Sequence, residues 1–137
     1  MSGEISELYE KLRVRLLEVY ERVKAEYTDP VIPAPAGLRE VVESEERPVL
    51  LYFTAEWCGP CIAFLETLRG VARKYAGRVL FYRVNVDENA RVADEFGIEY
   101  IPAIVVLVKG SVVYKAYGVA GRENLEGKIE RFLEMPG

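Results

Sequence analysis

Residues 54–64 read TAEWCGPCIAF, and this stretch holds both cysteines and the only tryptophan of the chain. Two cysteines three positions apart, with Gly59 and Pro60 between them, cannot tie distant parts of a fold together. Such a pair indicates redox chemistry, part of a metal site, or chance. The sequence around the pair has to decide between these interpretations.

The composition excludes several classes of function. The chain has 137 residues, enough for one domain with a core, and it carries 22 acidic residues against 18 basic ones. This balance offers no basic surface for nucleic acid. No apolar run approaches the roughly 20 residues of a membrane span, and the charged start lacks the apolar segment of a secretory signal. We therefore expect a cytoplasmic protein with no nucleic-acid or membrane partner, and cytoplasmic disulfides are usually catalytic.

The first part of the chain predicts an amphipathic helix over residues 4–27. Its apolar side chains recur at steps of three and four, the spacing of one helix face, and they are Ile5, Leu8, Leu12, Leu16, Val19 and Val23. The next segment, TDPVIPAPAG at residues 28–37, contains three prolines and ends this pattern. We predict two parts, a helical extension over residues 1–30 and a compact domain over residues 31–137.

Strand and helix patterns alternate within the compact domain. Apolar runs typical of strands cover residues 49–54, 79–86, 103–108 and 111–117. Helical spacing covers residues 38–45, 61–75, 87–96 and 122–134. Asp87 is expected to cap the third of these helices. This order predicts an α/β fold in which a central mixed sheet has helices on both faces.

The cysteine pair falls where a strand passes into a helix. Cys58 directly precedes the helix, so its sulfur should face the unpaired N–H groups and positive dipole end that favour a thiolate. Pro60 suits the first helical turn, where no N–H is needed, and Gly59 is expected to allow a tight turn. Cys61, one turn into the helix, returns beside Cys58. We predict that Cys58 attacks a substrate disulfide and that Cys61 resolves the mixed disulfide.

The sequence WCGPC at residues 57–61 resembles the active-site motif of the thioredoxin family. The resemblance extends to VNVDEN at 84–89, to FGIEYIPAIVVLVKG at 96–110 and to Gly118, and it covers residues 35–134. It implies the thioredoxin fold and a thiol–disulfide oxidoreductase that reduces protein disulfides in electron transport and cell redox homeostasis. It also implies no cofactor beyond the redox-active cysteine pair, and a thioredoxin-reductase-like partner as electron donor.

The resemblance also assigns supporting residues around the cysteines. Ile101–Pro102 corresponds to the dipeptide that the family places beside the active site with a cis bond. Ile101 and Gly118 correspond to a groove that holds the substrate. Trp57 corresponds to an exposed side chain that shields the sulfurs.

Several positions depart from the family pattern. Thr54, Ile62 and Glu66 differ from the residues usual in the family, and Tyr52 and Arg83 bear on the proton of Cys61. The family has a buried aspartate in the strand before the motif, and by register Tyr52 takes its place here. A phenol with a pKa of about 10 is a poor base at neutral pH, so we expect a core aromatic, with water or substrate accepting the proton of Cys61. The lysine usually near that aspartate becomes Arg83, which is expected to turn outward or to pair with another acid.

Alternatives remain beside the disulfide reductase. The cysteine pair can act as a protein disulfide oxidase or isomerase, or the domain can be a binding module recruited through its N-terminal helix. A zinc site shared between two chains is a weaker rival, because zinc takes about four ligands and the chain has no histidine. We predict no metal. The apolar stripe of the helix should be buried, either on its own domain or by self-association through residues 4–27.

Overall fold

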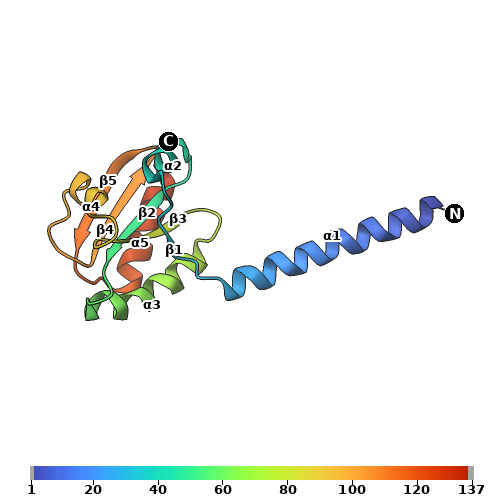
Figure 1. Ribbon diagram of the computed structural model, residues 1–137, viewed down its shortest axis with the longest axis horizontal. Coiled ribbons are helices and arrows are strands. Elements are labelled where there is room, and N and C mark those ends of the chain that lie inside the picture. The colour runs from blue at the N-terminus through green and yellow to red at the C-terminus, as the bar shows by residue number, and fades with distance from the viewer. Residues whose placement is uncertain (1, 136–137) are drawn as a thin grey trace.

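The computed structural model describes residues 2–135 and contains a five-stranded sheet with helices on both faces (Figure 1). The strand order is β1–β3–β2–β4–β5, in which β3 is parallel to β1 and β2, β4 is antiparallel to β2, and β5 is antiparallel to β4. The strands are β1 (Ile32–Pro33), β2 (Val49–Thr54), β3 (Leu80–Asn85), β4 (Ala103–Val108) and β5 (Ser111–Tyr117). The helices are α1 (Ser2–Tyr27), α2 (Leu38–Ser44), α3 (Gly59–Lys74), α4 (Ala90–Glu95) and α5 (Arg122–Glu134). The predicted α/β fold with a mixed sheet is confirmed.

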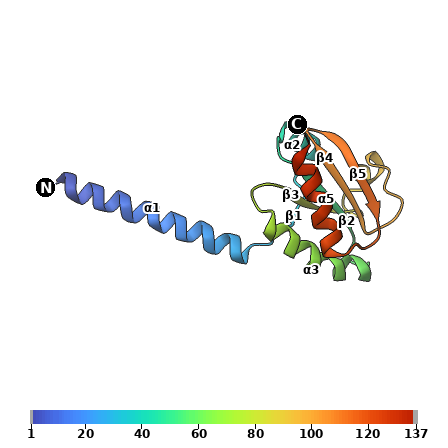
Figure 2. The same ribbon diagram turned by 180° about the vertical axis from the view of Figure 1, so that it is seen from behind.

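Two apolar layers hold the helices against the sheet. On one face α3 and α5 contribute buried side chains such as Phe64 and Ile129, and Figure 2 shows these two helices in front of the sheet. On the other face α2 and α4 contribute Val42 and Ala93. Burial of both sheet faces explains why the central strands are continuous apolar runs rather than alternating ones.

Strand β2 lies in the centre of the sheet and sets the position of the cysteine motif. Tyr52 faces the layer under α3 and α5, whereas its neighbour Phe53 faces the layer under α2 and α4. The strand ends at Thr54, and the chain turns directly into α3 at Gly59. The cysteines therefore lie at the carboxyl end of the central strand.

Two elements differ from the sequence expectation. β1 was not predicted, because its two residues lie among prolines, and proline, which cannot donate to a ladder, is tolerated mainly at a sheet edge. That is where β1 lies, paired in parallel with β3. The helix predicted from residue 87 begins instead at Ala90 and ends at Glu95, with Asn89 at its N-cap. The assignment of Asp87 as its cap is wrong.

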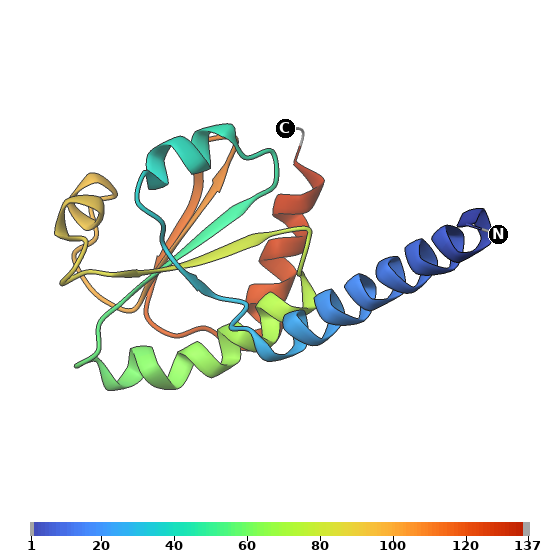
Figure 3. The same cartoon turned by 45° about the vertical axis from the view of Figure 1, so that its right-hand side comes forward.

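Helix α1 extends away from the domain as a single arm (Figures 1 and 3). All side chains from residue 3 to residue 20 are exposed, and Ile5 and Leu16 expose 71% and 69% of their surface. Of the two expected ways to bury the stripe, packing on its own domain is therefore wrong, and burial on a second copy stays a prediction. No helix within residues 2–135 is both long and apolar enough to cross a membrane.

Candidate redox site

Cys58 and Cys61 form a disulfide at the start of α3, with their Cα atoms 5.2 Å apart. Cys58 is the N-cap residue of the helix, and its Sγ accepts a hydrogen bond from the backbone N–H of Cys61 at 3.2 Å. The sulfur of Cys58 thus faces helix N–H groups, as expected from its place before the helix. Such a donor stabilises negative charge on sulfur, the form in which a thiol attacks a disulfide.

The two cysteines differ in their access to solvent. Cys58 keeps 6% of its surface exposed, whereas Cys61 has none. The order agrees with Cys58 as the reachable sulfur, although both residues are largely covered. A partner therefore reaches Cys58 by contacting the residues around it, since the sulfur does not protrude into solvent.

Of the two residues between the cysteines, Pro60 has the expected role and Gly59 does not. Pro60 lies in the first turn of α3, where its missing N–H costs nothing. Gly59 has no positive φ, and a Cβ at this position would meet no atom within 4 Å. The turn therefore does not require glycine, and the expectation that Gly59 is needed for a tight turn is wrong.

The side chain of Trp57 is held by Asp87, the residue that the sequence predicted as the cap of α4. Its side chain is 70% exposed, and its indole N–H donates to the carboxylate of Asp87 at 2.8 Å. Trp57 follows β2 and Asp87 follows β3, two parallel strands whose carboxyl ends meet at one edge. The sequence could have suggested this pair, because both residues follow parallel strands and an indole N–H can only donate.

The Ile101–Pro102 peptide bond is cis, as predicted. The carbonyl oxygen of Pro102 accepts the backbone N–H of Gly118 at 2.8 Å, so the two supporting residues lie side by side. Gly118 has φ +85, a conformation that favours glycine. Ile101 packs against the apolar cluster that contains both cysteines. The structure thus packs Ile101 against the cluster that includes the cysteines and links Gly118 to Pro102.

Exposed apolar side chains flank these residues along the chain. Ile62, Tyr100 and Val119 expose 55%, 68% and 63% of their surface, and each is a chain neighbour of a site residue. Tyr100 is steadied by an edge-to-face contact with Tyr117, with ring centroids 5.7 Å apart. No substrate role was predicted for these three residues from the sequence. They could have been found from the sequence, because each is an apolar residue directly beside a motif residue, where an exposed position is ordinarily polar.

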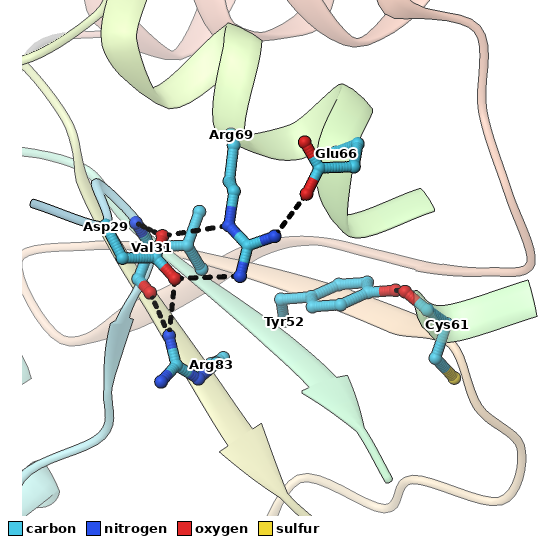
Figure 4. Close-up of polar contacts among 7 residues, drawn as sticks. All are labelled: Asp29, Val31, Tyr52, Cys61, Glu66, Arg69 and Arg83. Atoms are coloured by element: carbon cyan, nitrogen blue, oxygen red, sulfur yellow. Dashed lines mark hydrogen bonds and ion pairs between the residues drawn. The ribbon is translucent and has the colours of Figure 1, made fainter. Parts of the chain in front are cut away.

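Tyr52 is a core residue whose hydroxyl group supports the second cysteine. The side chain is fully buried, and its hydroxyl donates to the carbonyl oxygen of Cys61 at 2.6 Å (Figure 4). Its ring packs on Phe64, with centroids 5.8 Å apart. Burial raises the pKa of Tyr52 to about 12, so the phenol stays neutral at physiological pH. Tyr52 therefore positions the helix backbone and does not act as a base.

Arg83 pairs with another acid, which is one of the two outcomes expected for it. Its guanidinium donates to the carboxylate of Asp29 at 3.0 Å and to the carbonyl of Val31 (Figure 4). Arg69 of α3 donates to the same carboxylate through two nitrogens, at 3.1 Å and 2.9 Å. Burial raises the pKa of Asp29, but hydrogen bonds from Arg69 and from the N–H of Val31, with the charges of both arginines, lower it overall. This Asp29 clamp fastens the chain after α1 to α3 and to β3.

Metal ligands do not gather in the described part of the chain. Within residues 2–135 there is no group of three or more histidine, cysteine, aspartate or glutamate side chains placed to hold an ion. The two sulfurs are bonded to each other.

Comparison with known proteins gives consistent results. Residues 30–131 match the family model described as Thioredoxin. The chain is similar to Thioredoxin M4, chloroplastic, of Arabidopsis thaliana, with 38% identity over 94 residues that cover 69% of this chain and 48% of that protein. It is also similar to a thioredoxin of Synechocystis sp., with 33% identity over 98 residues that cover 72% of this chain and 92% of the relative.

Solved structures show the same fold. A mutant thioredoxin from Halobacterium salinarum NRC-1 superimposes with a TM-score of 0.67 at 24% identity, covering 80% of this chain and 97% of that one. The chain spans 48% of the length of Thioredoxin M4, chloroplastic, of Arabidopsis thaliana. It spans 55% of the length of Thioredoxin M-type, chloroplastic, of Pisum sativum.

Proposed function

This chain belongs to the thioredoxin family, and from that membership we propose that it is a thiol–disulfide oxidoreductase that reduces protein disulfides. Cys58 and Cys61 alternate between a dithiol and a disulfide. One observation carries the proposal: the sulfur of Cys58 accepts the N–H of Cys61 at the start of α3, at a 3.2 Å distance. In the reduced protein the same N–H would stabilise the Cys58 thiolate that attack on a disulfide requires.

The reductive cycle balances within the two sulfurs and the substrate. The Cys58 thiolate attacks one sulfur of a substrate disulfide, breaking the S–S bond and releasing the other sulfur as a thiolate that takes up a proton. Cys61, after losing its proton, attacks the Cys58 sulfur of the mixed disulfide and releases the second substrate thiol. The protein ends as the Cys58–Cys61 disulfide, and the substrate has gained two electrons and two protons.

The proton of Cys61 leaves without help from a buried acid. Within the described residues no charged or polar residue is buried, and the position beneath Cys61 is occupied by Tyr52. A phenol with a pKa of about 12 does not accept a proton near pH 7. Water or a group of the bound substrate therefore takes the proton, which makes the release step slower than with a nearby carboxylate.

The substrates and partners follow from this chemistry. Trp57, Ile62, Tyr100 and Val119 are exposed apolar side chains next in the chain to site residues, and they would offer an apolar surface to a substrate protein with an exposed disulfide. An extended substrate segment would pair with the backbone of Ile101, in the manner of an added strand. A thioredoxin-reductase-like donor returns two electrons per cycle, in keeping with a role in electron transport. We propose that the protein works in the cytoplasm.

Reduction of insulin tests the activity. The wild-type chain, supplied with dithiothreitol, should accelerate insulin precipitation, and Cys58→Ser should abolish the acceleration. Cys61→Ser should instead accumulate a mixed disulfide between Cys58 and the substrate, visible as an added mass. Full activity of Cys58→Ser would refute the proposal.

The direction of the reaction and the rival role of a binding module need separate measurements. Equilibration of Cys58 and Cys61 with glutathione gives the reduction potential. A value well above the glutathione couple would favour the oxidase or isomerase alternative. The exposed arm α1 is the observation that favours a binding module. In the cell, loss of function by Cys58→Ser supports the enzyme, whereas loss only on deleting residues 1–30 supports the module.

A further inference from the structure

Helix α1 carries an apolar seam that stays uncovered in the part of the chain that the structure describes. The seam consists of six side chains that expose between 39% and 71% of their surface: Ile5, Tyr9, Leu12, Leu16, Val19 and Val23. In Figure 3 the helix leaves the domain beside α3 and runs into solvent. Most helices in proteins are stabilised by packing of an amphipathic face and not by propensity alone. A helix with this seam is therefore built to be packed against a partner.

The spacing of the seam identifies the kind of partner. Steps of four and three residues alternate from Ile5 to Val23 without interruption, so two apolar positions repeat every seven residues. This is the a/d repeat of a coiled coil, narrower than the wide stripe of a helix on a globular core. Tyr9, Leu16 and Val23 take a positions, whereas Ile5, Leu12 and Val19 take d positions. A seam with this repeat is complementary to another helix of the same kind.

We propose that α1 pairs in parallel with α1 of a second copy of this chain, as a two-stranded coiled coil. The residues beside the seam select the parallel alignment. In it a g residue of one helix meets the e residue five positions later on the other. Leu8 then lies against Arg13, and Arg15 lies over the ring of Tyr20, an arrangement that suits a guanidinium.

The antiparallel alignment is disfavoured by like charges. The antiparallel register that covers all six seam positions sets Ile5 against Val23 and Leu12 against Leu16. In that register Arg13 faces Arg13 of the second copy, and Arg15 faces Arg15. Like charges that face each other across an interface cost free energy, so they disfavour that alignment. The parallel dimer opposes no like charges at these positions.

The parallel pairing has a consequence for the redox sites. The Asp29 clamp begins two residues after α1 ends, so each domain is fastened close to the C-terminal end of its helix. Both domains therefore lie at the same end of the coiled coil. The dimer presents two cysteine pairs together, and a substrate with two disulfides can meet both at a raised effective concentration.

Sedimentation equilibrium on the full chain tests the pairing. The wild-type protein should have twice the 15.5 kDa mass of one chain. Leu12→Lys should raise the dimer dissociation constant about a hundredfold or more, because it places two charges in the seam. Val14→Lys is the matched control, since Val14 is comparably exposed, 47% against 54%, but lies outside the seam. A monomeric wild-type protein, or equal weakening by Val14→Lys, would overturn the proposal.

Crosslinking tests the orientation in the full chain with Cys58→Ser and Cys61→Ser. Ile5→Cys should form a disulfide-linked dimer with itself on mild oxidation. An equal mixture of Ile5→Cys and Val23→Cys chains should give no mixed dimer beyond background. A mixed dimer without the self-linked one would overturn the parallel alignment. Insulin reduction by Leu12→Lys, with Cys58 and Cys61 intact, should match the wild type, which separates failure of the pairing from failure of the proposed activity.

Discussion

Replacing Tyr52 by phenylalanine removes only the hydroxyl oxygen, so this variant tests the contribution of that hydroxyl group. The hydroxyl donates to the carbonyl oxygen of Cys61 at 2.6 Å, and the ring that remains still packs on Phe64. A carbonyl inside a helix ordinarily also accepts an N–H from the next turn. The loss is therefore that of one net hydrogen bond, about 1 kcal/mol. For a domain of this size that corresponds to a melting temperature lower by roughly 3–5 °C.

The same variant separates a positioning role from a catalytic one. With a pKa of about 12, only about one Tyr52 side chain in 10⁵ is ionised at pH 7. Removal of the hydroxyl should therefore leave the midpoint of the pH profile for release of the mixed disulfide unchanged. Single-turnover reduction of a disulfide peptide, measured from mildly acidic to alkaline pH, gives that profile. A shifted midpoint, or release slowed tenfold at pH 7, would refute the assignment of Tyr52 as a structural residue.

Tyr52→Asp is the complementary change. It should lower the free energy of unfolding by about 3–5 kcal/mol, because it opens a cavity in the core, and it should speed release near pH 7 by supplying a base. Burial raises the pKa of the introduced carboxyl group above its value in the unfolded chain. Above about pH 4 the unfolded chain gives up this proton while the folded state keeps it. The loss in the free energy of unfolding therefore grows as the pH rises above about 4. If stability and release are both unchanged, position 52 contributes neither to packing nor to proton transfer.

Other positions give independent predictions. Asp29→Asn should lose about 1–2 kcal/mol at pH 7, because the partly exposed Asp29 clamp then lacks its charge. Since the pKa of Asp29 is lowered on folding, that deficit should fade as denaturation is measured below about pH 4, whereas the exposed Glu66→Gln should change little. Gly118→Ala should cost about 1–2 kcal/mol through its positive φ, while Gly59→Ala should be neutral or slightly stabilising in thermal melts. Trp57→Phe should leave stability within about 0.5 kcal/mol, since its bond to Asp87 is exposed, but should weaken binding of a trapped peptide substrate. An unchanged affinity would contradict a role of Trp57 at the substrate surface.

The elements with strong local patterns could be predicted from the sequence. β2, β4, β5 and α5 have the predicted bounds, because buried runs and helical spacing are properties of neighbouring residues. β1 depends on pairing with β3, from which it is separated by about fifty positions, so no local pattern reveals it. The start of α4 was wrong for a similar reason. Asp87 looks like a cap in sequence, but in space its carboxylate meets the indole of Trp57.

The site shows the same division. The cysteine pair, the cis Ile101–Pro102 bond and the covering of Cys61 were accessible through the motif. The partner of Arg83 could be stated only as an unnamed acid, because Asp29 lies in a proline-rich segment whose path depends on tertiary contacts. The requirement for Gly59 was inferred from its type alone, and the backbone does not use its freedom. The two-part division at residue 30 stays a prediction.

The long arm also changes how the protein moves through solvent. At about 1.5 Å per residue, the 26 residues of α1 make a rod roughly 39 Å long, whereas a domain of about 100 residues has a radius of gyration near 13 Å. The frictional coefficient of the chain therefore exceeds that of a sphere of equal mass. Rotation about the long axis is faster than end-over-end rotation. Even a single chain would leave a gel-filtration column ahead of a compact 15.5 kDa standard. Elution volume alone would imitate a dimer, so light scattering or sedimentation equilibrium is needed to count the chains.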